Sequence, residues 1–162
     1  MRPTIGAALA GARAACLLAL LLGVSTLRAA EPGPVRFFAV LSAEEQSTTT
    51  LSKGTGRADF SLDRDTLRLS WRLSFSGLTS PATGAAVHGP QRPGTNAGIQ
   101  IDLAPKSPGS PSQSSAVLTD AQLEYLLAGR MYVNVRSRRY PAGELRGQIQ
   151  RVPPPAGAPA SP

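Results

Sequence analysis

Few side chains in this sequence are suited to acid–base or nucleophilic chemistry. His88 is the only histidine, and it stands directly before the turn-forming pair Gly89-Pro90. An imidazole at this place can act as a general base, anchor a ligand or hydrogen-bond at the end of a strand. No serine or cysteine is paired with His88 in a catalytic motif, and the scattered glycines form no phosphate-binding loop. We therefore favour a structural role for His88.

A row of polar side chains lies near the C-terminus, where Glu144, Arg146 and Gln148 alternate with apolar residues. Alternation places all three on one face of a strand. Arg146 can hydrogen-bond a carboxylate, and the row can pair with Asn134 or Arg136 on the preceding strand. We expect the row mainly to set sheet register. A glycosidase would need a second acid converging on Glu144, and no spacing in the sequence indicates one.

Arginines are concentrated in the same stretch, where Glu144 is the only acidic residue. Such a cluster can hold an anionic glycan or an envelope surface, and its binding would then depend strongly on salt. The alternative is a solvated hairpin tip, because exposed charge runs are usually soluble faces. The members of this cluster are Arg130, Arg136, Arg138, Arg139, Arg146 and Arg151.

The first thirty residues differ from the rest of the chain. Arg2 and Arg13 precede an apolar run at 14–22, and no acidic residue occurs before Glu31. This pattern predicts a secretory signal peptide over 1–30, because the run is shorter than the roughly 20 residues of a membrane span. We expect a secreted or periplasmic protein with no membrane span after cleavage.

Cleavage would also remove Cys16, the only cysteine. The mature chain would then have no disulfide or thiolate ligand and a single histidine, so we expect no metal site and no cofactor. It would keep 14 basic and 10 acidic residues, a net charge of +4. That charge is small for nucleic-acid binding, and we expect no nucleic-acid partner.

Period-two patterns predict strands along the remaining sequence. An apolar run at 35–41 is suited to a first strand, and 42–53 reads as a loop. Two alternating segments around the connector 63–66 predict a hairpin. We expect Leu62 opposite Leu67 and Phe60 opposite Leu69, which keeps every apolar side chain on one face.

Further strands are predicted at 85–88, 99–103 and in a closing hairpin over 131–149. The Pro- and Ser-rich segment 104–115 reads as a surface loop. Thr119 and Gln122 have capping-box spacing, and Gly129 is placed to end a short helix. Residues 152–162 are Pro/Ala-rich and are expected to be disordered. These patterns predict an all-β domain at 31–151, a Greek-key β-sandwich or partly closed barrel with one short helix.

The sequence resembles the CHRD (chordin) domain family over roughly residues 35–151. CHRD domains occur in chordin, an extracellular antagonist that binds bone morphogenetic proteins, so the resemblance implies export and binding rather than a reaction. The resemblance is carried by LTDAQ at 118–122, LLAGRMYVNV at 126–135 and PAGELRGQI at 141–149, with FSGL at 75–78, AVHGP at 86–90 and NAG at 96–98.

Two positions depart from the family pattern. The first histidine of the family's HiH motif corresponds to Ala86, and the histidine of its NVHT motif corresponds to Arg136. The HiH strand is also distantly similar to the copper strand of Cu/Zn superoxide dismutases. A copper or zinc centre needs three or four ligands, and His88 alone cannot provide them.

We therefore expect an exported, non-enzymatic, CHRD-like binding module that recognises an unknown protein or an anionic glycan or envelope polymer. One alternative is a structural or protective envelope protein, and a less favoured one is a hydrolase-type enzyme that uses His88. The candidate ligand contacts are His88, Asn134, Arg136, Arg138, Arg139, Glu144 and Arg146.

Overall fold

The structure is a computed structural model that describes residues 33–104 and 109–153. The expected signal peptide at 1–30 lies outside the described residues, as does the expected tail from residue 154 onward. Part of the expected surface loop, residues 105–108, also lies outside them.

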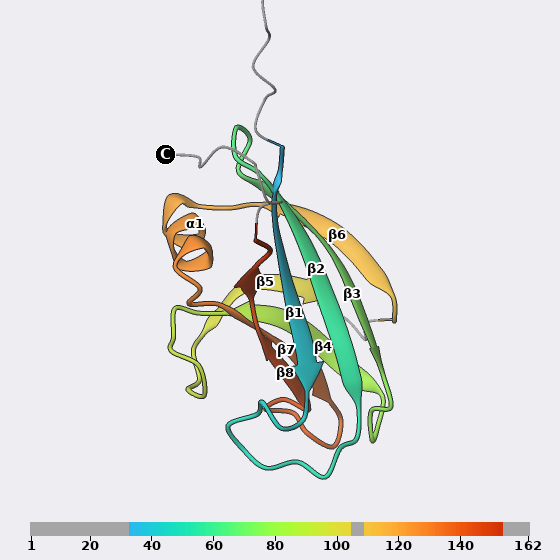
Figure 1. Ribbon diagram of the computed structural model, residues 1–162. Coiled ribbons are helices and arrows are strands. Elements are labelled where there is room, and N and C mark those ends of the chain that lie inside the picture. Colours follow the sequence, from blue (N-terminus) through green and yellow to red (C-terminus); the bar gives the residue numbers. More distant parts are fainter. Residues whose placement is uncertain (1–32, 105–108, 154–162) are drawn as a thin grey trace, which may run out of the picture. The chain divides into compact units, whose positions relative to one another are not determined.

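The described chain folds into antiparallel strands and one short helix (Figure 1). The sheet order is β5-β4-β7-β8-β1-β2-β3-β6, and β9 pairs with β1. The elements are β1 (Val35–Ser42), β2 (Thr55–Asp63), β3 (Arg68–Ser76), β4 (Ala82–His88), β5 (Ile99–Ala104), β6 (Ser112–Val117), α1 (Asp120–Leu127), β7 (Tyr132–Ser137), β8 (Leu145–Gln148) and β9 (Gln150–Arg151).

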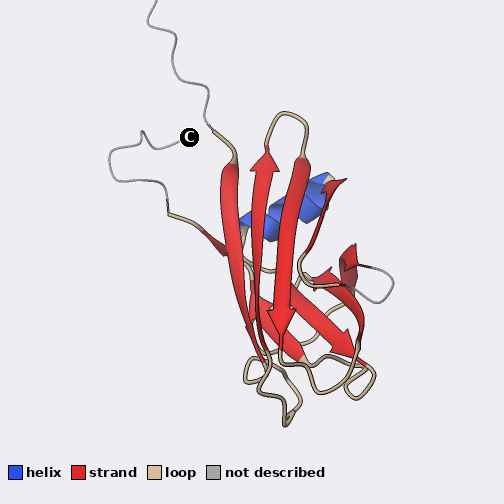
Figure 2. Cartoon of the chain, turned by 90° about the vertical axis from the view of Figure 1, so that its right-hand side faces the viewer, coloured by secondary structure: helices blue, strands red, loops and turns tan. Residues whose placement is uncertain are grey.

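The sheet curls until its two end strands, β5 and β6, touch. The long strands β1, β2 and β3 cross the shorter strands of the other half at an angle (Figures 1 and 2). After the β4–β5 hairpin the chain returns to place β6 beside β3, and β7 then returns beside β4. These returns are Greek-key connections, which confirms the predicted all-β, Greek-key fold. Of the two predicted forms, a β-sandwich and a partly closed barrel, the nearly closed sheet corresponds to the barrel.

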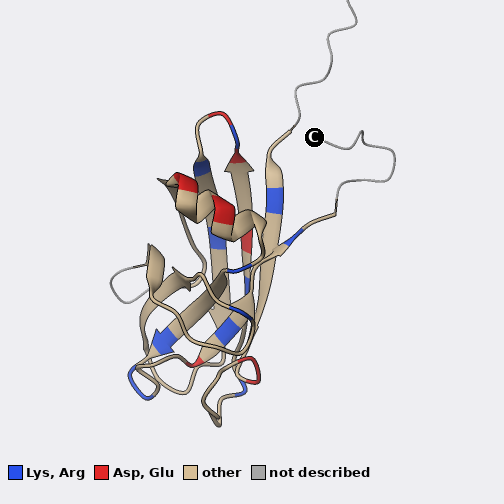
Figure 3. Ribbon diagram, turned by 90° about the vertical axis from the view of Figure 1, so that its left-hand side faces the viewer, with Lys and Arg blue, Asp and Glu red and all other residues tan. Residues whose placement is uncertain are grey.

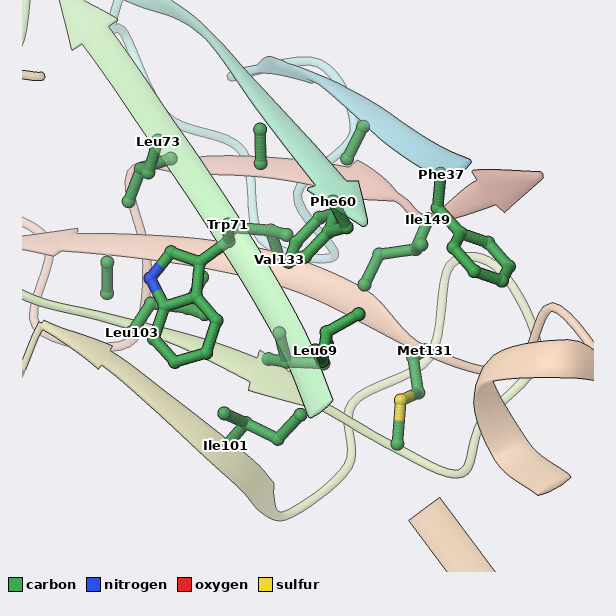
Figure 4. Close-up of a cluster of buried hydrophobic side chains, with 14 of the residues drawn as sticks. Phe37, Phe60, Leu69, Trp71, Leu73, Ile101, Leu103, Met131, Val133 and Ile149 are labelled. Atoms are coloured by element: carbon green, nitrogen blue, oxygen red, sulfur yellow. The ribbon is translucent and has the colours of Figure 1, made fainter. Parts of the chain in front are cut away.

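The core fills the space between the two halves of the sheet (Figure 4). Leu69, Trp71 and Leu73 of β3 point inward, while the residues between them face solvent. Val133 of β7 and Ile101 of β5 meet them from the opposite side. Burying a side chain of this size contributes roughly 1.5–3 kcal/mol, so packing alone can stabilise the domain.

The predicted β2–β3 hairpin is present, but the predicted register differs from the observed one by two residues. Leu62 pairs with Leu69, not with Leu67. Leu67 belongs to the turn, where it has a φ of 53°, and Asp63 Oδ1 accepts hydrogen bonds from the amides of Asp65 and Thr66. This aspartate turn lengthens the loop. Because the error is an even number of residues, the apolar side chains still share one face.

The loop predicted at 104–115 is wrong for its second half. Residues from Ser112 onward form β6, which pairs antiparallel with β3 from Arg68 to Leu73. β6 has the sequence SQSSAV and mostly exposed side chains, so it carries no hydrophobic alternation. Its strand conformation comes from hydrogen bonds to β3, a tertiary effect that local composition does not reveal.

The predicted helix and its capping box are confirmed. The Thr119 side chain accepts a hydrogen bond from the Gln122 amide, and the Gln122 side chain accepts one from the Thr119 amide. Gly129 follows the helix with a φ of 67°, a conformation that favours glycine. The Gln122 side chain also donates to the Gln100 carbonyl at 2.7 Å, which joins α1 to β5.

The predicted closing hairpin of β7 and β8 is also confirmed, with Asn134 opposite Arg146. β8 passes so close to β1 that a Cβ atom at Gly147 would collide with the Val40 carbonyl oxygen and with the Leu41 side chain. Glycine at this position lets the two halves of the sheet join.

We expect Gly147→Ala to lower the free energy of unfolding by about 1–3 kcal/mol, because the added methyl must push β8 away from β1. Urea unfolding followed by the fluorescence of Trp71, the only tryptophan, measures this. Gly98→Ala is the matched control, since a Cβ there meets no atom within 4 Å. Equal stability of the two variants would contradict the close approach.

Candidate functional site

The outer face of β4, β7 and β8 is unusually well covered. Tyr132, Asn134 and Arg136 alternate with core residues of β7 and therefore point away from the core. Even so, Tyr132 is only 2% exposed, Asn134 5% and Arg146 of β8 2%. The loops after β1 and after β4 provide this cover.

Three side chains from three adjacent strands form a stack on this face. The His88 ring lies parallel to the Tyr132 ring, with 5.2 Å between centroids and 12° between planes. The Arg146 guanidinium lies over the Tyr132 ring, 3.6 Å from its centroid. We call this arrangement the His88–Tyr132–Arg146 stack. A cation on an aromatic face is attracted by the ring, most strongly where water is excluded.

The loop after β4 is bonded to this stack. Arg146 Nη2 donates to the Thr95 carbonyl at 2.8 Å, and Nη1 donates to Asn96 Oδ1 at 3.3 Å. The Ala97 amide donates to the Tyr132 hydroxyl oxygen at 3.0 Å. Asn96 Oδ1 also accepts from the Ser47 hydroxyl at 2.9 Å, so the loop after β1 is held to the loop after β4.

Asn134 has a similar bridging role. Its Oδ1 accepts a hydrogen bond from Gln46 Nε2 at 3.0 Å, and its Nδ2 donates to the Ala142 carbonyl at 2.9 Å. Gly143 packs so tightly here that a side chain would overlap the Asn134 carboxamide. Both ends of the Asn134 carboxamide are thus hydrogen-bonded, and they join β7 to the loop after β1 and to the β7–β8 connection.

The surroundings of His88 favour its neutral form. Its Nδ1 lies 2.9 Å from the Ala97 carbonyl oxygen, which can only accept, so Nδ1 carries the proton. Burial lowers the pKa of His88, and the positive charges of Arg136 and Arg146 lower it further. Nε2 is buried without a hydrogen-bond partner in the described residues. No hydroxyl, thiol or carboxylate hydrogen-bonds to the ring there, so the structure assembles no catalytic pair around it.

Arg136 extends along the outer face instead of into solvent. A Cβ atom at Gly84, its partner on β4, would lie 2.6 Å from Arg136 Nη2, so the guanidinium rests directly on the glycine. Arg136 Nε is buried and has no partner in the described residues. Arg138 and Arg139 follow in the β7–β8 connection, where both are exposed.

Glu144 is fully buried and lies apart from the stack. Its Oε1 accepts hydrogen bonds from the Ser52 hydroxyl and the Thr79 amide, both at 2.6 Å. Burial acts to raise the pKa of Glu144, but hydrogen bonds from Ser137, Ser52 and Thr79 outweigh it and lower the pKa. The carboxylate therefore ties the loops after β1 and β3 to the start of β8.

The polar row predicted for Glu144, Arg146 and Gln148 therefore does not act as one group, because its members bond to different loops. Glu144 bonds to Ser52 and Thr79, whereas Arg146 bonds to the loop after β4. The described residues form no ion pair between Glu144 and Arg146. The predicted pairing of Arg146 with Asn134 across the hairpin is confirmed.

The predicted basic cluster does not form one patch. Arg130 precedes β7 and lies over the Tyr125 ring of α1, while Arg138 follows β7 at its other end. At about 3.3 Å per residue the two are on the order of 25 Å apart. Arg151 lies on β9 and Arg146 is buried. In the ribbon of Figure 3 the segments coloured for Lys and Arg are accordingly spread over both ends of the domain. Three members remain close in sequence: the half-buried Arg136 and the exposed Arg138 and Arg139.

Sequence reasoning missed Tyr132, Thr95 and Asn96, which contact Arg146 and complete the stack. Tyr132 alternates with core residues of β7 in the same way as Asn134 and Arg136. This alternation was the signal that could have assigned Tyr132 to the candidate face. No local pattern indicates the loop contacts of Thr95 and Asn96.

Three other observations concern metal ligands, membranes and cavities. Across 33–104 and 109–153, no three side chains among His, Cys, Asp and Glu come close enough to hold a metal ion. In the same described ranges, no helix has the length and apolar character needed to cross a bilayer. A hollow of about 150 Å³ is lined by Val40, Ser42, Glu45, Gln148 and Gln150, and His88 is not part of its lining.

Glu144 should make the domain sensitive to acid. Its folded pKa is lowered, so its stabilisation is complete above the ordinary value of 4.5 and is lost as pH falls through the lower folded pKa. We expect Glu144→Gln to cost about 1.5–3 kcal/mol at pH 7 and to flatten the loss of stability between pH 5 and 3. Urea unfolding at several pH values tests this, with the exposed Glu124→Gln as control. Equal pH slopes in both variants would contradict it.

Comparison with known proteins adds one match. A family model described as "CHRD domain" matches residues 37–149, which include every candidate site residue. Neither the curated proteins nor the solved structures give a match to the chain.

Proposed function

Because the chain belongs to the CHRD domain family, a family of small binding-type domains, we propose that it is an exported, non-enzymatic module that binds an anionic extracellular or envelope ligand. The ligand is either an acidic polymer or an acidic surface of a partner protein. The proposed contact surface consists of Arg136, Arg138 and Arg139, which we call the β7-end arginines.

The observation that carries this proposal is that, in the described residues, no acidic side chain balances the charge of the β7-end arginines. The ion pair found in the described residues, Arg57 with Asp59, lies on β2, and no carboxylate pairs with any of the three. Arg136 has an unpartnered Nε, and Arg138 and Arg139 are exposed. Guanidinium groups bind carboxylate, sulfate and phosphate groups well because their donors form a planar fork.

The backbone beneath these arginines is anchored. The Arg138 amide donates to the Pro81 carbonyl at 3.1 Å, and the Arg139 amide donates to the Ser80 hydroxyl at 2.8 Å. The Ser137 amide also donates to the Tyr140 carbonyl at 3.2 Å. A charged group held on a fixed backbone loses less entropy when a ligand binds, which favours a binding role.

The surroundings of His88 support a non-enzymatic role. Its Nδ1 is used by a backbone carbonyl, and its ring is packed against Tyr132 beneath the loop after β4. Glu144, the partner that a hydrolase would require, hydrogen-bonds to Ser52 and Thr79 instead. A general base needs reach to a reacting proton, and neither group is arranged for that task.

The proposal of export rests on the sequence. The basic and apolar pattern of 1–30 is typical of a signal peptide. The only cysteine lies in that segment, so the domain from Glu31 onward needs no disulfide. Its extensive apolar core is consistent with a fold stabilised by packing alone.

We expect the protein to bind a sulfated glycan such as heparin, used as a probe, and to lose affinity as salt increases, because screening weakens exposed charge pairs. Replacing Arg136, Arg138 and Arg139 together by Ser should weaken binding about tenfold at low salt, since each exposed pair contributes about 0.2–1 kcal/mol. Titration by calorimetry or fluorescence over a salt series measures both effects.

The matched control replaces Arg64, Arg68 and Arg72 by Ser, which removes the same charge from the exposed face of the β2–β3 hairpin. If both triple variants lose affinity equally, binding follows net charge and the proposed surface is wrong. If the wild-type protein shows no saturable, salt-sensitive binding to acidic glycans or envelope extracts but associates with itself, the structural envelope role is favoured instead.

A further inference from the structure

An open hollow of about 420 Å³ lies at the end of the domain where the loops after β1, β3 and β7 come together (Figure 1). Its lining comes from the end of β3, the loop after β3 and the start of β4. We call it the β3-loop hollow. The lining residues carry no charge, and Phe75, Leu78, Pro81 and Ala82 make much of the lining apolar.

The β3-loop hollow directly adjoins two of the β7-end arginines. The Arg138 amide donates to the Pro81 carbonyl, and the Arg139 amide donates to the Ser80 hydroxyl. Both acceptor residues line the hollow. Both arginines are exposed. An apolar hollow and a pair of exposed basic residues therefore lie side by side on one surface.

Basic residues border the β3-loop hollow. Besides the two arginines, the exposed Lys53 lies beside it, because a Cβ atom on Gly77 would be 3.7 Å from the Lys53 carbonyl oxygen. Glu144 accepts a hydrogen bond from the Thr79 amide of the same loop, but its side chain is fully buried. Complementary charge guides association, so this border favours an acidic partner.

The loop that lines the hollow is held in place. Glu144 Oε1 accepts from the Thr79 amide at 2.6 Å, and the Ser110 hydroxyl accepts from the Phe75 amide at 2.7 Å. Phe75 and Leu78 are half-buried and pack against the core. Because the hollow is already formed, a side chain that enters it need not order the loop, which favours binding.

We propose that the ligand is a partner protein whose docking segment places an apolar side chain in the β3-loop hollow and a nearby acidic side chain against Arg138 and Arg139. This inference rests on the proposed function and narrows it to one class of ligand. A sulfated or phosphorylated polymer could use the arginines, but it has no apolar side chain to contact Phe75 and Leu78. Apolar contacts combined with arginine are typical of protein–protein interfaces.

Two acidic polymers serve as probes: polyglutamate, and a random copolymer of glutamate and tyrosine with the same number of glutamates per chain. We expect the copolymer to bind about fivefold more tightly, an increase that the burial of about 40 Å² of apolar surface would provide. The preference should persist as salt increases, because screening weakens the charge pairs but not the apolar contact. Fluorescence anisotropy of the labelled polymers over a salt series measures both affinities.

Two variants change the hollow: Leu78→Ser removes apolar lining, and Ser76→Gln places a longer side chain at an exposed lining position. Each should lose the preference for the copolymer and keep heparin binding. The matched control Ser70→Gln, at an exposed position of β3 outside the lining, should keep both. Trp71 fluorescence confirms that each variant is folded.

Equal affinity of the wild-type protein for the two polymers, or a preference that survives in both hollow variants, would overturn this inference. Either result would leave heparin binding by the β7-end arginines standing. Absence of saturable heparin binding would instead contradict the proposed function, so the two proposals fail in distinguishable ways.

Discussion

The guanidinium of Arg146 is buried against the Tyr132 ring with no carboxylate bonded to it in the described part of the chain, and the outer face is organised around that burial. Removing a charge from water costs several kcal/mol unless other groups replace the water. Here the replacements are the ring face, the Thr95 carbonyl and Asn96 Oδ1. Two of these belong to the loop after β4, so this loop must be ordered for the arginine to be buried.

The ordered loop determines what the remaining side chains can do. It brings the Ala97 carbonyl to His88 Nδ1 and thereby keeps a proton on that nitrogen. It also covers Tyr132, so the polar face of β7 opens only toward Arg136 and the exposed Arg138 and Arg139. Packing thus separates a covered, structural half of this face from an accessible, basic half. The proposed ligand contacts lie in the second half.

Alternation along the chain was enough to predict the core-facing strands, the closing hairpin and the capped helix, because each depends on neighbouring residues. It was not enough for β6, whose serines form a strand only because β3 offers hydrogen bonds. The predicted β2–β3 register was wrong because Asp63 lengthens the turn by accepting hydrogen bonds from the amides of Asp65 and Thr66. The same limit applies to the site: residue type indicated His88 and Arg146, but Tyr132 between them and the loop above them depend on cross-strand placement.

Hydrogen exchange in Arg146→Lys tests the organising role of the buried guanidinium most directly. Lysine keeps the charge but cannot donate to Thr95 and Asn96 as a planar fork while lying flat on Tyr132. We expect the Ala97 amide, which donates to the Tyr132 hydroxyl, to exchange at least about tenfold faster, while the amides of β2 and β3 keep their protection. Unchanged protection at Ala97, or an equal loss throughout the sheet, would contradict it.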